Sequence, residues 1–145
     1  MKRAKRLEPV NEVMREAERE CARRLAALQT RLLEAEQRCE ELRRYLAEYQ
    51  SSFFQRAKAG IGVSGMRDYQ IFIARLGDAV QQQGGVVEQL RGDCERARTL
   101  WREAAARKQA VGKVIANARS EELQLDAQRQ QREIDERAQR AGGPR

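Results

Sequence analysis

The sequence has no histidine, only two prolines, and only seven aromatic residues (one Trp, three Tyr, three Phe) among its 145 residues. Histidine is the usual general base at neutral pH and the commonest zinc ligand, so ordinary acid-base catalysis and zinc binding are not expected. The prolines are Pro9 and Pro144, and no proline interrupts a helix between them. With 41% hydrophobic and 35% charged residues, the chain cannot build a large globular core. These absences favour an all-α protein that is not an enzyme, with no cofactor and no metal.

Long apolar runs are also missing, and no stretch is long enough to span a bilayer. The basic segment Met1–Arg6 is not followed by the apolar stretch of a signal peptide. We therefore expect a cytosolic or peripheral protein. Cys21, Cys39 and Cys94 are odd in number and lack metal-binding spacing, so we expect reduced thiols in a helical core.

The formal net charge is +7, which fits three partner classes: nucleic acid, an anionic membrane surface or an acidic protein. The charges are nevertheless interleaved, as in Arg15-Glu16-Ala17-Glu18-Arg19-Glu20. Interleaving is typical of a solvated helix face and argues against a continuous basic stripe.

A first apolar seam, with alternating steps of three and four, predicts a left-handed coiled coil. Its nine positions are all apolar: Leu25, Leu28, Leu32, Ala35, Cys39, Leu42, Leu46, Tyr49 and Phe53. The same stepping continues upstream through Val10, Met14, Ala17 and Cys21, with one extra step of four, a stutter, before Leu25. We expect a helix over about 8–58.

A second seam follows, and fourteen of its sixteen positions are apolar. It comprises Met66, Tyr69, Ile73, Leu76, Val80, Gln83, Val87, Leu90, Cys94, Ala97, Trp101, Ala104, Lys108, Val111, Ile115 and Ala118. Residues 59–65 separate the seams and contain three glycines, which disfavour helix, and Ser64, which can cap the next one. We expect a turn over 59–65 and a second helix over about 66–118.

Two seams joined by a short turn can bury each other only by running antiparallel, which places residue i roughly opposite residue 124 − i. Helices of about 50 residues would then make a coiled-coil hairpin about 75 Å long. The chain is expected to form one coiled-coil domain over 1–145, with an unpaired helical or frayed tail after about residue 118. Gly84-Gly85 is the expected kink, and Lys108 is expected near Glu16 or Glu20, either as an ion pair or with a snorkelling stem.

The string Gly60-x-Gly62-x-x-Gly65 matches the dinucleotide-binding G-x-G-x-x-G pattern. That fingerprint requires a strand before the glycines and a helix after them, whereas a long charged helix is expected here. We interpret the string as the turn between the helices. Neither a phosphate-binding P-loop nor a G-x-S-x-G elbow occurs.

Six of the seven aromatic residues fall around this turn, and only Trp101 lies elsewhere. Three consecutive apolar residues, Ile71, Phe72 and Ile73, cover about 200° of a helix, so one or two of them must be exposed. Two interpretations stay open. The aromatic group is either a widened seam that closes the hairpin or a docking patch for a partner.

Several strings, in order around the turn, resemble the flagellar FliJ family over essentially the whole chain. They are Tyr45-x-x-x-Tyr49, Gly60-Ile61, Tyr69-Gln70-Ile71-Phe72-Ile73-x-x-Leu76-x-x-Ala79, Trp101-Arg102-Glu103 and Asp135-Glu136-x-Ala138-Gln139-Arg140. The resemblance implies a stalk-like component of the flagellar type III export apparatus that supports flagellum assembly, motility and chemotaxis. It also implies a location in the cytoplasm, peripheral on the cytoplasmic side of the cell membrane.

The partners implied by the resemblance are the hexameric export ATPase FliI, whose ring assembly the family promotes, the export-gate protein FlhA, and export chaperones. Matching positions for gate docking are Tyr45, Tyr49, Phe72, Leu76, Ala79 and Gln83. For ATPase contact the resemblance indicates the end where the termini meet, and we expect Arg6, Arg15, Arg19 and Arg140 there.

Two alternatives to this function are a generic coiled-coil adaptor and a basic coiled coil that binds nucleic acid. The second predicts salt-sensitive binding to polyanions along a continuous basic stripe. The interleaved acids argue against it, and no nucleic-acid partner is expected.

Overall fold

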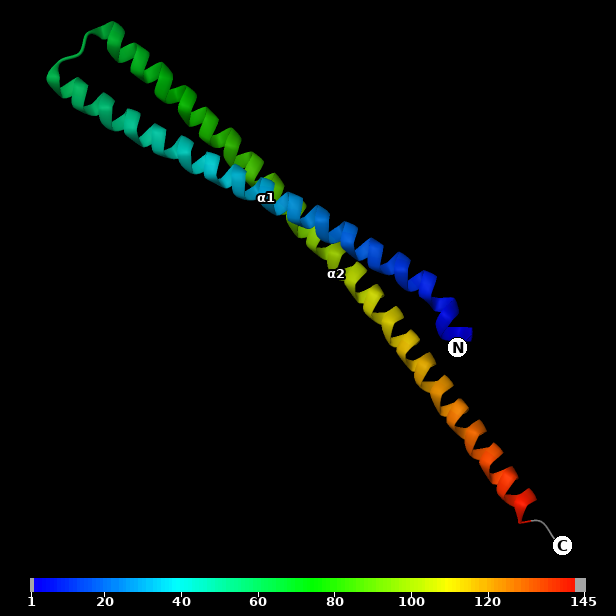
Figure 1. Ribbon diagram of the computed structural model, residues 1–145. Coiled ribbons are helices and arrows are strands. Elements are labelled where there is room, and N and C mark those ends of the chain that lie inside the picture. Colours follow the sequence, from blue (N-terminus) through cyan, green and yellow to red (C-terminus); the bar gives the residue numbers. More distant parts are fainter. Residues whose placement is uncertain (1, 143–145) are drawn as a thin grey trace. The chain divides into compact units, whose positions relative to one another are not determined.

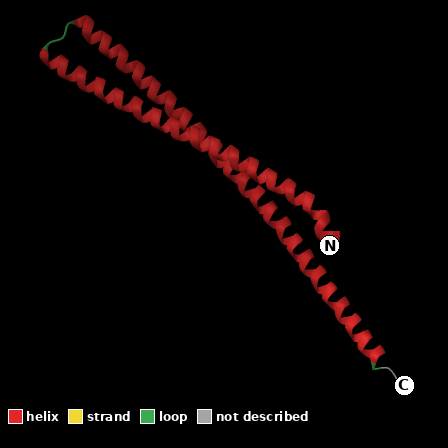
Figure 2. Cartoon of the chain, in the orientation of Figure 1, coloured by secondary structure: helices red, strands yellow, loops and turns green. Residues whose placement is uncertain are grey.

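The computed structural model describes the backbone of residues 2–142 and the side chains of residues 3–142. Two helices, α1 (Lys2–Ala59, 58 residues) and α2 (Val63–Ala141, 79 residues), account for nearly all of it, and no strand occurs in this part of the chain. Figures 1 and 2 show the helices and the short turn between them. The helices pack antiparallel on each other, which confirms the predicted all-α helical hairpin.

The turn comprises only residues 60–62, fewer than the expected 59–65. Gly60 has φ 93°, a left-handed value that favours glycine and ends α1. The carbonyl oxygen of Gly62 accepts a hydrogen bond from the Met66 N–H at 3.0 Å, which makes Gly62 the residue before the first helical turn. Ser64 already lies inside α2, so the expectation that it caps this helix was wrong.

Both helices extend beyond the expected bounds. α1 begins at Lys2 and contains Pro9, although proline inside a helix removes one backbone hydrogen bond. Ala4 is buried, so packing on α2 holds the turns before Pro9 in place. α2 continues past residue 118 to Ala141. Arg119, Glu121 and Glu122 still contact α1, so the pairing extends about four residues beyond the expected position, and residues 123–141 of the expected tail are all exposed. The last residues of that tail, 143–145, lie outside the described part.

Contacts divide the chain into two compact units. The turn unit is Ala22–Leu100, and the terminal unit consists of the described residues up to Cys21 and from Trp101 onward. Each unit contains one stretch of α1 packed against one stretch of α2.

The core of the turn unit is thin and built from small and medium-sized side chains. Ala35, Cys39, Val87 and Leu90 form a buried cluster, and Leu28 and Leu32 pack against it. All six lie on the predicted seams, so the two registers are confirmed here. Ala35 and Cys39 are small, which lets the helix backbones approach closely.

A polar contact crosses this core. The side-chain amide of Gln83, at one of the two polar seam positions, donates a hydrogen bond to the Ala35 carbonyl oxygen at 3.1 Å. α2 then passes through Gly84 and Gly85 as continuous helix. A hollow of about 210 Å³ lies beside Gly84 and is lined by Cys39 and Val87, among others.

The terminal unit buries Ala4, Ala104, Ile115 and Ala118, and polar contacts join its helices. Glu18 accepts a hydrogen bond from the Trp101 indole N–H at 3.1 Å and lies 3.9 Å from the Lys108 ammonium. Lys108 was expected near Glu16 or Glu20, and Glu18 lies midway between them in the sequence. Further along, Arg119 bonds Glu8 at 3.1 Å and Arg3 lies 3.9 Å from Glu121.

Leu32→Asp should lower the free energy of unfolding by about 2 kcal/mol or more, because a carboxylate would replace an apolar contact of the small core without a partner. Thermal unfolding followed by circular dichroism measures this. Arg31→Ala, one position away and exposed, is the control and should change stability little. Equal stability of the two variants would contradict the register.

Gly84→Ala/Gly85→Ala should raise the free energy of unfolding by about 1 kcal/mol or more. An added Cβ at either position meets nothing within 4 Å, so the gain in helix propensity is not opposed by a clash. In the control Gly65→Ala, the Cβ would approach Ile61 Cγ1 at 2.9 Å, and the gain should be smaller or reversed. A double variant with an unchanged melting temperature would disprove this account.

Candidate functional site

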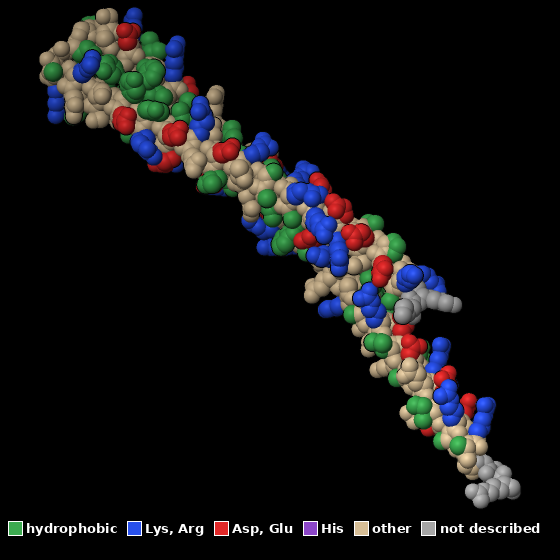
Figure 3. Space-filling model, in the orientation of Figure 1, with side chains coloured by type: hydrophobic (Ala, Val, Ile, Leu, Met, Phe, Trp, Pro, Cys, Tyr) green, Lys and Arg blue, Asp and Glu red, His purple; other side chains and the backbone are tan. Residues whose placement is uncertain are grey.

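The residues expected to dock on the export gate belong to the turn unit, on both of its helices. We call them the turn-end surface: Tyr45, Tyr49, Phe72, Leu76, Ala79 and Gln83. Spacings of four put Tyr45 with Tyr49 on one face of α1 and Phe72 with Leu76 on one face of α2. Figure 3 shows hydrophobic side chains gathered near the turn.

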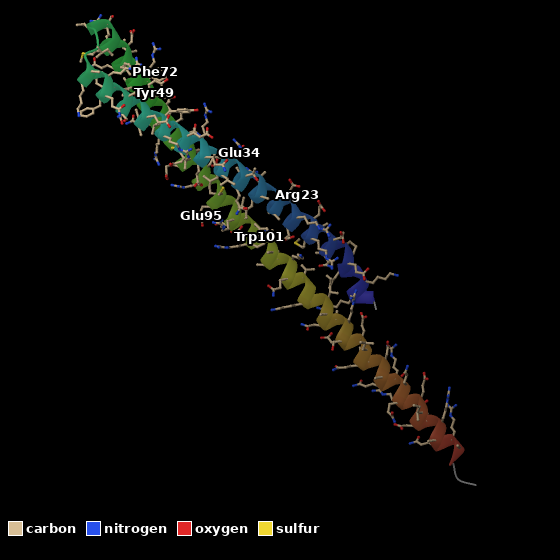
Figure 4. The ribbon with its side chains drawn as sticks, turned by 60° about the vertical axis from the view of Figure 1, so that its left-hand side comes forward. Arg23, Glu34, Tyr49, Phe72, Glu95 and Trp101 are labelled. Carbon is tan, nitrogen blue, oxygen red and sulfur yellow. The ribbon has the colours of Figure 1, made fainter. Side chains whose placement is uncertain are left out.

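An aromatic pair joins the helices at this surface. The Tyr49 and Phe72 ring centroids are 4.6 Å apart with the planes tilted by 52°, and Figure 4 shows the two residues beside each other. Tyr69 extends the group, 6.4 Å from Tyr49 and 5.9 Å from Phe53. Such tilted arrangements are the favoured geometry of aromatic pairs.

The same pair is substantially exposed. Phe72 keeps 42% and Tyr49 39% of its surface accessible, and Tyr45 keeps 54%. Ile71 and Phe72 are exposed while Ile73 is half-buried, which confirms the prediction that one or two of these three residues are exposed. The aromatic group therefore closes the end of the hairpin and still presents apolar surface.

The other members of the turn-end surface are less exposed to solvent. Leu76 and Ala79 are half-buried. Gln83 is also half-buried, and its amide is already bonded to the Ala35 carbonyl. Exposed apolar area thus concentrates on Tyr45, Tyr49 and Phe72.

The turn unit has further exposed apolar residues that were not among the expected site residues. Phe54 is 61% exposed, with the Lys58 ammonium 4.5 Å from its ring centroid. Val63 and Met66 are exposed at the start of α2. Phe54 follows the seam residue Phe53 directly, and this adjacency is the sequence signal that could have identified it.

The four arginines expected at the ATPase contact belong to the terminal unit and are exposed. Arg15 lines a hollow between α1 and α2, and Arg19 lies 3.8 Å from Glu16 on its own helix. Arg6 lies near the start of α1, whereas Arg140 lies on the unpaired tail of α2. The Glu122 carboxylate of α2 accepts a hydrogen bond from the Ala4 N–H near the start of α1. Arg140 lies eighteen residues after Glu122, which is about 27 Å of helix beyond the start of α1. These arginines do not form one cluster.

No group of three or more His, Cys, Asp or Glu side chains in the described part is placed to hold a metal ion. Among residues 2–142 no helix is long and apolar enough to cross a membrane. The G-x-G-x-x-G string follows α1, not a strand, and forms the turn and the first residues of α2. It therefore lacks the strand that a dinucleotide site requires.

Comparison with protein families gave a match to the model described as Flagellar FliJ protein, over residues 2–143. Comparisons with curated proteins and with solved structures gave no match. The family match covers nearly the whole chain. The chain belongs to the flagellar FliJ family and is a component of the flagellar protein export apparatus.

Proposed function

We propose that the chain is a non-enzymatic stalk that binds the export ATPase FliI through its terminal unit and docks on the export gate FlhA through its turn-end surface. It promotes assembly of the ATPase ring and links that ring to the gate. Family membership supports the general role. The observation that carries the specific proposal is the exposed Tyr49–Phe72 pair in the turn unit.

Exposed aromatic side chains held by their neighbours are typical binding anchors, because they bury much apolar area and lose little conformational freedom on binding. Phe72 meets this description, since contact with Tyr49 fixes its ring while 42% of its surface stays accessible. Tyr45 extends the same apolar face by one turn of α1. Leu76 lies one turn further along the same face of α2.

The terminal unit offers a different chemistry. Arg6, Arg15 and Arg19 are exposed on α1 and suit an acidic surface of the ATPase, where opposite charges guide association. Arg140 would reach a separate part of the ATPase from the unpaired tail.

Export chaperones are further proposed partners, and the protein is proposed to act in the cytoplasm, at the membrane only through the export apparatus. The strongest general test is a pull-down from a flagellated bacterium. Recovery of the ATPase and the gate protein would support the proposal. Recovery of nucleic acid alone, or of neither protein, would favour one of the two alternative classes.

Binding to the isolated ATPase should weaken as salt rises from low to moderate concentration, because exposed ion pairs are screened over about 8–10 Å. Binding to the gate protein should change less, since an aromatic anchor dominates it. Calorimetric titrations of both partners at several salt concentrations measure this. ATPase binding that is indifferent to salt would contradict the role of the arginines.

Phe72→Ala/Leu76→Ala should weaken gate binding by about thirty-fold or more while the helices persist, because an interface anchor commonly contributes 2 kcal/mol or more. The melting temperature should fall moderately, since Leu76 is half-buried. Circular dichroism, ATPase binding and gate binding would be measured together.

The matched control is Phe54→Ala, which removes a more exposed ring of the same unit that is not part of the turn-end surface. It should leave gate binding unchanged. Gate binding retained by a folded Phe72→Ala/Leu76→Ala variant would mean that the aromatic pair only closes the hairpin.

A further inference from the structure

The terminal unit contains a hollow of about 630 Å³ whose walls come from both helices. α1 contributes Glu8, Asn11 and Arg15, which spacings of three and four place on one face. The α2 residues of the lining run from Ala105 to Arg119, which is about 21 Å of helix. The hollow is therefore a groove along the line where the helices meet.

Most of the charged side chains that line the groove are positive. Four cations, Arg15, Lys108, Lys113 and Arg119, line it together with a single carboxylate, Glu8. Arg119 bonds Glu8 at 3.1 Å, and Lys108 lies 3.9 Å from Glu18. Arg15 and Lys113 are exposed and make no ion pair with any described residue. Two cations of the groove thus lack a carboxylate partner.

We call the uncharged part of the lining contributed by α2 the floor of the groove, and it consists mainly of small and apolar residues. Gly112 lies in it, and an added Cβ there would meet nothing within 4 Å. Ala105, Ala116 and Ile115 complete the apolar part. The space beside Gly112 can therefore take an apolar side chain from a ligand while the walls bind its carboxylates.

We infer that this groove binds an acidic segment of a protein partner, one that carries carboxylates along with an occasional aliphatic side chain. Charge complementarity supports this occupant, because carboxylates would pair with Arg15 and Lys113. The length of the lining matches an acidic helix of about four turns. The inference rests on the proposed function in one respect, since Arg15 is also a proposed ATPase contact.

A nucleic acid fits the groove less well. Duplex DNA carries one negative charge per about 1.7 Å and requires a continuous basic track. Glu8 lies within the groove, and Glu12 and Glu16 follow on α1, so a continuous polyanion would meet carboxylates on either side of Arg15. A helical segment can instead space its carboxylates so that they face Arg15 and Lys113.

The test is calorimetric titration of the full chain with a synthetic peptide of Glu-Glu-Leu-Ala repeats, about four turns long. We expect salt-sensitive binding that weakens about tenfold in Arg15→Gln/Lys113→Gln, where two exposed ion pairs are lost. The control Arg129→Gln/Arg132→Gln removes the same charge from the exposed tail and should bind the peptide as the unaltered chain does. Equal weakening in both variants, or no binding at all, would overturn the inference.

A second variant separates shape from charge. Gly112→Gln fills the floor without changing the charge, and it should raise helix stability because glycine is replaced. Weaker peptide binding by this more stable variant would support the groove as the site, and unchanged binding would overturn it. Duplex DNA is titrated in parallel, and DNA binding with the same dependence on Arg15, Lys113 and Gly112 would also overturn it.

The same variants are tested for ATPase binding, so that the two proposals can fail separately. Loss of peptide binding with ATPase binding retained would support the groove and remove Arg15 from the ATPase contact. Loss of ATPase binding with peptide binding retained would support that contact and overturn the groove.

Discussion

The structure depends on burying a narrow apolar seam between two helices. In the turn unit this seam is made of small or medium residues, such as Ala35, Cys39 and Val87. Large aromatic residues enter the seam of this unit only near the turn, as Tyr49, Phe53 and Tyr69, so elsewhere stability must come from many modest contacts repeated along the helices. Such a seam tolerates few substitutions. Each lost contact leaves a gap that solvent can reach, and no second layer of side chains lies behind it to limit the loss of stability.

A thin seam also has to specify its register, since regular apolar repeats can slip by a heptad. In the terminal unit, the side chain of Glu18 favours one register because it contacts both Trp101 and Lys108. In the turn unit, Gln83 adds a hydrogen bond to a backbone carbonyl of the facing helix. These contacts are partly buried, so a slipped register would leave polar groups without partners.

The surfaces proposed for function are made largely of residues that are not fully buried in the seam. At the turn, α2 carries more apolar residues than one seam can bury, and Ile71 and Phe72 are left partly exposed. In the terminal unit, Gly112 and two alanines leave space between the helices that the seam does not fill. The turn unit thus has more apolar side chains than its seam buries, and the terminal unit has space that small residues leave unfilled. The two proposed surfaces therefore differ in chemistry.

Sequence periodicity alone determined the two helices, their antiparallel pairing and the buried positions other than Ala4. A repeat of 3.5 residues leaves one apolar stripe on each helix, and the glycine-rich turn lets the two stripes meet only in an antiparallel pair. It also indicated that one or two of Ile71, Phe72 and Ile73 are exposed, since neighbouring helical residues point about 100° apart. Only the tertiary structure decided that α1 begins at Lys2, that Gln83 is used inside the hairpin, and that Lys108 meets Glu18. Those outcomes depend on the distances between side chains of one helix and atoms of the facing helix. The apolar repeat along a single helix contains no information about these distances.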